Sequence, residues 1–415
     1  MTKGAKHMQD AATRPTFWRR DATVIGIVGF VHGISHFFQL ILAPLFPWLK
    51  EAFQLSYAEL GLLMTIFFVI SGIGQALAGF VVDKIGAGKV LFFGVAFLGL
   101  GTLILAFAQN YLSLMAGSLI AGLGNSVFHP ADYTVLNQQV SKQRLGHAFS
   151  VHGVCGNLGW ALAPLFMVPL AQIFGWRTAL LCASVIPLAA LILLAFQRDW
   201  LMAAPAHRQL KTVDAPADTT LAFLKIPAVW MCFGFFLVTA MALGGIQNFS
   251  ATSLRAMYGM SLGTATTAYS AFMLASAAGM VLGGFLASRT SDHDKTIALA
   301  FSLAGTFSFL LASGVANAQL AFILMACIGF GSGIAGPSRD LMIRAAAPKN
   351  ATGRVYGTVY SGLDSGSALA PLLFGWMMDA QHPSWLFIGV GCFQLTAIVT
   401  AISVVGRSRS VAQTV

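Results

Sequence analysis

Charged residues are scarce in this sequence. Asp, Glu, Lys and Arg together make up 9% of its 415 residues, whereas a soluble domain has about 25%. Hydrophobic residues make up 57%, and the mean hydropathy is +0.77. Such a chain has too little polar surface to fold in water, so we expect a protein that crosses a membrane many times.

Cysteine motifs and a cleavable leader are also lacking. The five cysteines fall in apolar segments without CxxC spacing, which favours buried thiols and argues against disulfides. Residues 1–21 are polar, and the apolar segment that follows is too long for the core of a signal peptide. We expect no cofactor and no resident metal ion.

Twelve apolar segments are each long enough to cross a bilayer, which takes about 20 residues. They are residues 22–49, 57–83, 88–108, 112–138, 146–172, 176–196, 227–254, 263–287, 296–315, 319–345, 353–379 and 383–405. The sequence therefore predicts an all-α membrane protein with 12 transmembrane helices.

The basic residues are distributed unevenly around these segments. With both termini inside, 20 of the 24 Lys and Arg residues lie on the cytoplasmic side, and Arg339 lies within a span. Only Lys50, Arg177 and Arg255 lie outside. This positive-inside bias explains the net charge of +10 without a nucleic-acid partner. It predicts a multi-pass protein of the cytoplasmic (inner) membrane with both termini in the cytoplasm.

The longest connection divides the spans six and six. Its Ala, Pro and Asp content is typical of a linker. The predicted organisation is a cytoplasmic segment 1–21, an N-terminal six-helix bundle 22–196, a cytoplasmic linker 197–226, a C-terminal six-helix bundle 227–405 and a cytoplasmic tail 406–415.

The two halves of the chain repeat each other. "GLGNSVFHPADYTVL" (122–136) matches "GFGSGIAGPSRDLMI" (329–343) at an offset of 207 residues. The same offset carries "GWALAPL" (159–165) onto "GSALAPL" (366–372). This repetition predicts two pseudo-symmetric bundles related by an axis along the membrane normal.

The segment "GFVVDKIGAGKV" (79–90) completes a pattern that resembles the major facilitator superfamily. This segment is similar to the family's loop between the second and third spans. The resemblance implies the major facilitator fold, with Asp83, Lys84 and Lys89 holding a cytoplasmic gate. Gly79 and Gly86 would allow close helix approach and a tight turn.

A narrower resemblance comes from "SVFHP" (126–130) and the glycine-punctuated fifth span. Both are similar to the fosmidomycin-resistance subgroup of exporters. The arginine that many drug–proton antiporters carry in the fourth span is absent, because Ser118 stands four residues before Gly122. The usual multidrug coupling scheme therefore does not transfer directly.

Polar side chains within spans are costly and by default mark a transport pathway. His32, His36 and Gln39 are spaced i, i+4, i+7, so they share one face of the first span. A lone histidine there would most often be structural, but two with a glutamine favour substrate binding. His36 is also a candidate proton carrier. Gln247 in the seventh span is a further substrate candidate.

The fourth span has the same spacing in Asn125, His129 and Asp132. Pro130 removes a backbone donor and is expected to bend the helix at the substrate site. We assign Asn125 and His129 to substrate binding, and His129 and Asp132 to proton coupling. An alternative for Asp132 is a gate residue that bonds to helix termini.

The repeat offset places Arg339 of the tenth span at the position of Asp132. The family resemblance implies that both spans line the central cavity. Arg339 is then expected on the opposite wall, where it would pair with Asp132 or bind an anionic substrate.

Asp364 lies in the eleventh span, where its repeat mate is the neutral Asn157. A carboxyl group in an apolar environment can hold a proton near neutral pH. Asp364 is therefore a candidate coupling site, and the alternative is a partner for a helix end or for tyrosines.

These residues favour a proton-coupled exporter of a small anionic organic compound, working by alternating access around a central cavity. The subgroup resemblance implies a fosmidomycin-like phosphonate. Two alternatives remain open: transition-metal efflux through the intramembrane histidines, and proton-coupled uptake of an organic anion. No catalytic constellation is present, so an enzyme is not expected, and a monomer is the default for this fold.

Overall fold

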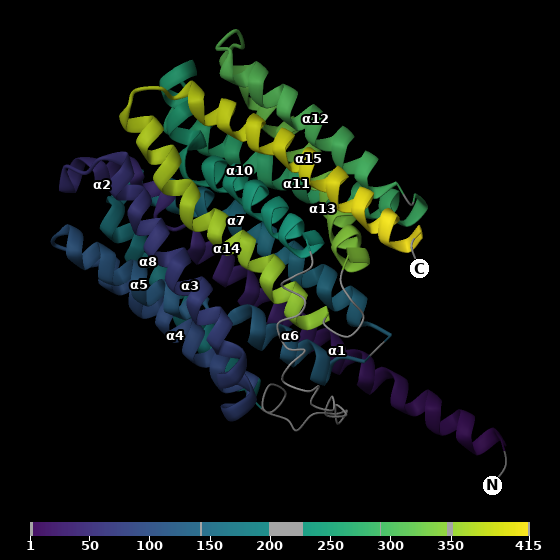
Figure 1. The fold of residues 1–415 in the computed structure, drawn as a ribbon. Coiled ribbons are helices and arrows are strands. Elements are labelled where there is room, and N and C mark those ends of the chain that lie inside the picture. The colour runs from purple at the N-terminus through teal and green to yellow at the C-terminus, as the bar shows by residue number, and fades with distance from the viewer. Residues whose placement is uncertain (1–2, 142, 199–226, 291, 347–351, 414–415) are drawn as a thin grey trace.

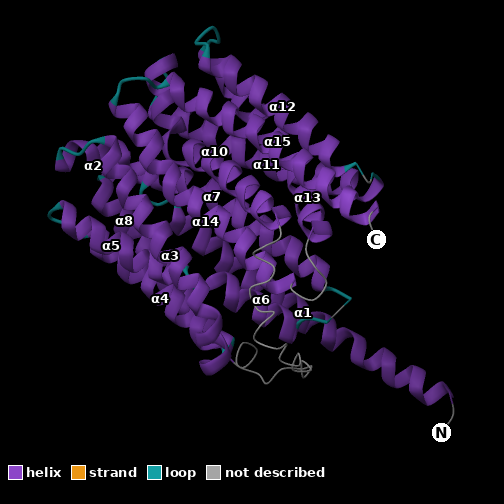
Figure 2. Cartoon of the chain, viewed as in Figure 1, coloured by secondary structure: helices purple, strands orange, loops and turns teal. Residues whose placement is uncertain are grey.

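The computed structural model describes residues 3–141, 143–198, 227–290, 292–346 and 352–413, and all regular structure in these ranges is helical (Figure 2). The description leaves out the side chains of residues 3–18, 228, 340, 342–346, 352–358, 360 and 404–413. Most of the predicted linker, residues 199–226, and parts of the predicted terminal segments therefore lie outside the described residues.

The first half of the chain forms one helical bundle. Its helices are α1 (Lys3–Gln39), η1 (Ala43–Leu45), α2 (Phe46–Phe53), α3 (Tyr57–Ile85), α4 (Ala87–Ala106), α5 (Tyr111–Asn125), α6 (Phe128–Gln139), α7 (Leu145–Phe174) and α8 (Trp176–Phe196). Ser56 and Asn110 begin α3 and α5 with reciprocal capping hydrogen bonds, which satisfy backbone donors that a helix end leaves free.

The second half forms the other bundle, which lies beside the first in Figure 1. Its helices are α10 (Pro227–Tyr258), α11 (Leu262–Arg289), α12 (His293–Ala312), α13 (Ala318–Ala346), α14 (Thr352–Asp379) and α15 (Ser384–Gln413). The described ends of the chain, α1 and α15, both point to the same end of the molecule, here called the terminal end. The opposite end is called the far end.

Eleven helical segments of the described chain are long and apolar enough to cross a membrane. The helix α14 has the length of a span but is not among these eleven. Two expected spans are interrupted: the first after Gln39, and the fourth at Ser126 and Val127. The predicted bend in the fourth span is therefore a break, and Pro130 sits in the first turn of α6, where a missing N–H costs little.

The two bundles meet along two helix pairs, α3 with α14 and α7 with α11. At the far end, Asp379 accepts hydrogen bonds from the backbone N–H groups of Tyr57 and Ala58, at 2.7 and 2.8 Å. Closer to the middle, the hydroxyl of Thr65 donates to the carbonyl of Ala368 at 2.7 Å. These contacts hold the far halves of the bundles together.

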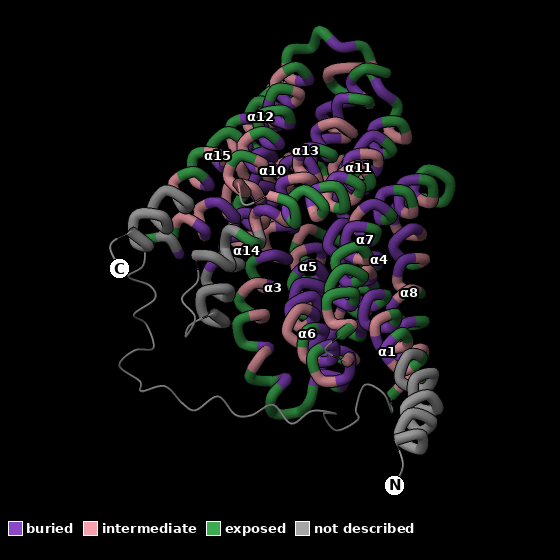
Figure 3. Tube along the Cα trace, turned by 90° about the vertical axis from the view of Figure 1, so that its right-hand side faces the viewer, coloured by how far each residue is buried: buried purple, intermediate pink, exposed green. Residues whose placement is uncertain are grey.

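Large apolar side chains remain exposed on the outward faces of the helices, while the faces between helices are buried (Figure 3). Phe80, Ile173 and Phe196 are examples, with 75%, 71% and 83% exposure. In water such surface would drive aggregation, but lipid tails solvate it without cost. The pattern agrees with helices that face lipid on all outer sides.

Candidate functional site

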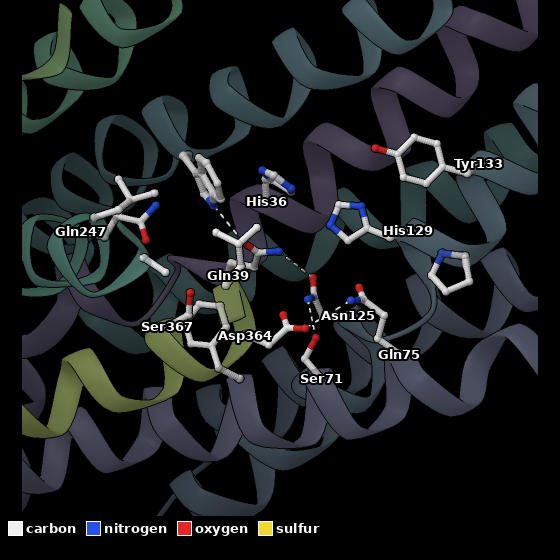
Figure 4. A pocket seen from close by; sticks show the side chains of 16 residues that line it. His36, Gln39, Ser71, Gln75, Asn125, His129, Tyr133, Gln247, Asp364 and Ser367 are labelled. Atoms are coloured by element: carbon white, nitrogen blue, oxygen red, sulfur yellow. Dashed lines mark hydrogen bonds between the residues drawn. The ribbon is translucent and has the colours of Figure 1, made fainter. Parts of the chain in front are cut away.

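A cavity of about 730 Å³ lies between the bundles (Figure 4). It is lined by His36, Gln39, Phe68, Ser71, Gln75, Asn125, His129, Pro130, Tyr133, Trp160, Ala240, Leu243, Gln247, Leu363, Asp364 and Ser367. Most of the polar lining comes from the first bundle. The cavity is large enough for a small organic molecule.

A chain of hydrogen bonds crosses the first-bundle wall of this cavity. The indole N–H of Trp160 donates to Gln39 at 2.9 Å, and the Gln39 amide donates to Asn125 at 3.2 Å. The Asn125 amide donates in turn to the hydroxyl of Ser71 at 2.8 Å. Four helices (α7, α1, α5 and α3) are tied together, so two of the predicted substrate residues, Gln39 and Asn125, hold each other in place.

Asp364 contributes a carboxylate from the second bundle. Gln75 of α3 donates to its Oδ2 at 3.3 Å, which makes a polar contact between the bundles beside the cavity (Figure 4). The backbone of Gly72 is close by, since a Cβ there would lie 3.1 Å from the Asp364 Cβ. Asp364 is thus both part of the cavity wall and part of the contact between bundles.

Behind the cavity wall lies a fully buried carboxylate, Asp132 of α6, with 0% exposure. Its Oδ2 is 3.0 Å from Nδ1 of His32 and 3.1 Å from Nε2 of His152. An ionised carboxylate only accepts, so both rings donate to it, which puts the proton on Nδ1 of His32 and on Nε2 of His152. The expected gate role, with Asp132 bonded to helix ends, does not match these contacts.

Five aromatic rings connect this carboxylate to the cavity. His32 stacks on His152 with centroids 3.4 Å apart, and lies 4.3 Å from His36 and 5.1 Å from His129. His36 stacks on Trp160 at 4.2 Å. Of the four histidines, His36 and His129 line the cavity, whereas His32 and His152 do not. The cluster therefore has two layers.

Close packing of α1 against α7 makes this arrangement possible. A Cβ on Gly159 would overlap the carbonyl oxygen of Gly33, so the two backbones are in contact. A Cβ on Gly156 would lie 2.7 Å from Nδ1 of His36 and 3.1 Å from Nε2 of His32. The glycines predicted only as packing surfaces also make room for the imidazoles.

One ligand nitrogen from each of His32, His129 and His152 lies within 4.8 Å of the others. Three imidazoles at this spacing could share a transition-metal ion. The metal alternative thus gains His152, which replaces His36 in the expected ligand set.

A family model described as Major Facilitator Superfamily matches residues 27–371 and, in a second match, residues 246–414. The chain belongs to this superfamily. The resemblance, the fold class and the expectation that the protein is not an enzyme are thereby confirmed. The chain is a transporter embedded in the membrane through many helices.

Two curated relatives cover most of the chain. The "Uncharacterized MFS-type transporter YfnC" of Bacillus subtilis (strain 168) is 28% identical over 312 residues, 74% of each chain. The "Fosmidomycin resistance protein" of Escherichia coli (strain K12) is 25% identical over 334 residues, 80% of each chain. A bacterial homologue of the human lysosomal transporter Spinster, in an inward-facing and occupied conformation, has a TM-score of 0.74 at 14% identity. That match covers 95% of this chain and 97% of the other, and it shows the fold.

The gate segment of this superfamily member lies at the terminal end of α3 and α4. Gly86 has φ +92°, a left-handed conformation that permits the expected tight turn. A Cβ on Gly79 would meet no atom within 4 Å, so the close approach expected there is absent. Asp83, Lys84 and Lys89 are exposed, and no described residue forms an ion pair with them. The gate contacts are not made in this conformation.

Arg339 does not face Asp132 across the cavity. It lines an adjoining lobe of about 250 Å³, and its guanidinium carbon lies 5.0 Å from the centre of the Phe236 ring. The expected pairing of Arg339 with Asp132 is therefore wrong for this conformation, because Asp132 is enclosed by two histidines of its own bundle. Gln247 lines the cavity as expected.

The sequence-based site set omitted His152, Trp160, Ser71 and Gln75. His152 had been noted only as a polar residue of the fifth span. Ser71 and Gln75 are spaced i, i+4 in an otherwise apolar span, which is the signal that would have found them. Trp160 gave no such signal, because its role depends on its neighbours.

Proposed function

We propose that this protein is a proton-coupled exporter of a small organic compound with an anionic group. In this proposal the central cavity binds the compound and the two bundles rock around it. The observation that carries the proposal is the buried oxygen of Asp132 between His32 and His152. The likeness to a fosmidomycin resistance protein supports export of a drug-like molecule.

Counting charges explains why this cluster suits an exchangeable proton. An ionised Asp132 with two neutral imidazoles has one net negative charge, and one added proton makes the cluster neutral. Buried uncompensated charge is costly, so a cluster that alternates between these states responds strongly to its surroundings. The imidazoles supply sites that gain and lose protons near neutral pH.

The layered arrangement suggests how proton and substrate compete. His36 and His129 lie between the cavity and the Asp132 cluster, with His36 4.3 Å and His129 5.1 Å from His32 by ring centroid. A substrate that takes hydrogen bonds from His36 or His129 reorders protons along these rings. Binding from the cytoplasm would then release a proton, as antiport requires. Asp364 is a second proposed proton site.

The contacts at the far end, together with the exposed gate segment, favour a cavity that opens toward the terminal end. With the orientation expected from the basic residues, that end is cytoplasmic. The conformation would then be the one that loads an exported substrate.

Proteoliposomes with a trapped pH dye test the proposal. We expect fosmidomycin, added under an imposed proton gradient, to cause proton movement in the wild type and in the surface control Asp292→Asn. Asp132→Asn should abolish that proton movement. Fosmidomycin transport without proton movement, or full coupling in Asp132→Asn, would contradict the proposal.

Transition-metal efflux is the second candidate, and the spacing of His32, His129 and His152 is the observation that favours it. The same proteoliposomes receive Zn²⁺, Fe²⁺ and Ni²⁺ one at a time. A response to a metal alone would replace the exporter proposal. Proton-coupled uptake of an organic anion predicts the same residues, with proton and substrate moving in the same direction.

A further inference from the structure

The space between the bundles has two lobes with charges of opposite sign. Asp364 is the carboxylate that lines the larger lobe, and no described lysine or arginine lines that lobe. Arg339 lines the smaller lobe, whose described lining has no carboxylate. The lobes share Trp160 and Leu243 as lining residues, and Leu363, the neighbour of Asp364 in the chain, lines both. One ligand can therefore extend from one lobe into the other.

Each charged group stands among groups that leave it available to a ligand. Asp364 accepts one hydrogen bond, from Gln75, while a carboxylate has room for about four. Around Arg339 the lining is mostly apolar, with Ser332 and Gln394 as polar members. These two bond to each other at 3.2 Å, from the Gln394 amide to the Ser332 hydroxyl. Arg339 itself lies against the face of Phe236.

A ligand with a single charge would match only one lobe. An anion held at Arg339 leaves the Asp364 carboxylate to face it across a poorly solvated space, and a cation at Asp364 meets the reverse problem. Opposite charges on one molecule complement both groups. This matters most where the local dielectric is low and charge–charge terms are large.

We propose that the substrate is a small zwitterion, with its anionic group at Arg339 and its ammonium group at Asp364. The neck that the lobes share, formed by Trp160, Leu243 and Leu363, suits a short aliphatic chain between the two groups. This inference rests on the proposed function only in taking the central cavity as the substrate site.

Binding to the purified full-length protein by titration calorimetry tests this inference. The probes are ω-aminoalkylphosphonates of increasing chain length, the matching alkylphosphonates and the matching alkylamines. We expect the best zwitterion to bind roughly ten- to a hundredfold more tightly than either singly charged partner, as for loss of one charge-assisted contact. Equal affinity of the zwitterion and the plain phosphonate would overturn the inference.

Two variants assign the ends of the ligand. Asp364→Asn should erase the advantage of the amine and leave phosphonate binding intact, and Arg339→Gln should do the opposite. The exposed Asp292→Asn and Arg289→Gln serve as matched controls with unchanged affinities. An advantage of the amine that survives in Asp364→Asn would also overturn the inference.

The outcome is separable from that of the proposed function. Calorimetry measures binding and needs no proton movement, whereas the proteoliposome assay measures coupling through Asp132. Zwitterion binding without coupling would reject the proton-coupled exporter and keep the zwitterion site. Coupled transport of a plain phosphonate, with no gain from an amine, would do the reverse.

Discussion

His32 and His152 stack their imidazoles with centroids 3.4 Å apart, and both rings bond to the same carboxylate oxygen of Asp132. One ring comes from α1 and the other from α7. The pair converts two isolated polar residues of separate spans into one unit with a shared proton count. Most of the expected chemistry depends on this unit.

Substrate binding and proton coupling should separate in Asp132→Asn. Asp132 does not line the cavity, so we expect the affinity for fosmidomycin, measured by calorimetry, to change less than about threefold, a shift below 1 kcal/mol. Proton release on binding, measured in a weakly buffered solution with a pH dye, should disappear. Unchanged proton release would show that the coupling proton resides elsewhere, with Asp364 the next candidate.

Gly156→Ala should disturb the histidine cluster directly. The added methyl group would lie 2.7 Å from His36 and 3.1 Å from His32, and overpacking of this kind costs roughly 1–3 kcal/mol. We expect a lower thermal midpoint in detergent and weaker coupling. Gly153→Ala, one turn away in α7, is the matched control because nothing lies within 4 Å of its Cβ. Equal midpoints for the two variants would mean that the imidazoles move aside freely.

Trp160→Phe should weaken the wall of the cavity. It removes the N–H that donates to Gln39 and leaves a buried acceptor without that partner, a loss of about 1–3 kcal/mol. We expect this loss in substrate affinity or in stability, measured by calorimetry and thermal unfolding. Trp376→Phe, at a tryptophan that is 56% exposed, controls for the general loss of an indole. If the two variants behaved alike, the Trp160–Gln39 bond would have no energetic role.

Asp379→Ala should favour opening at the far end. The carboxylate caps two backbone donors at the start of α3, and helix N-terminal caps contribute about 0.5–2 kcal/mol. Spin labels at the exposed Leu112 and Val315, in a background without native cysteines, report the separation of the bundles at that end. We expect a larger population at long distance than in the wild type. The exposed Glu51→Gln should leave the distribution unchanged, and a wild-type distribution in Asp379→Ala would reject this role.

The sequence by itself determined the class of protein and much of its site. Apolar segments of membrane length and the duplicated halves are properties of the local sequence, so they survive without knowledge of the fold. The spacing i, i+4 places His32 and His36 on one face because the helical period is intrinsic to the backbone. The motif at residues 79–90 identified the superfamily for the same reason.

Only the tertiary structure decided which polar residues meet. His152 joins Asp132 because α1 and α7 approach closely enough for their backbones to touch, and no periodicity within one helix encodes that distance. Arg339 and Asp132 occupy equivalent positions in the repeats, yet the repeats carry different neighbours, and these turn one toward an open lobe and enclose the other. Contacts between helices depend on rotation, register and the breaks after Gln39 and at Ser126, which follow from packing of the whole chain.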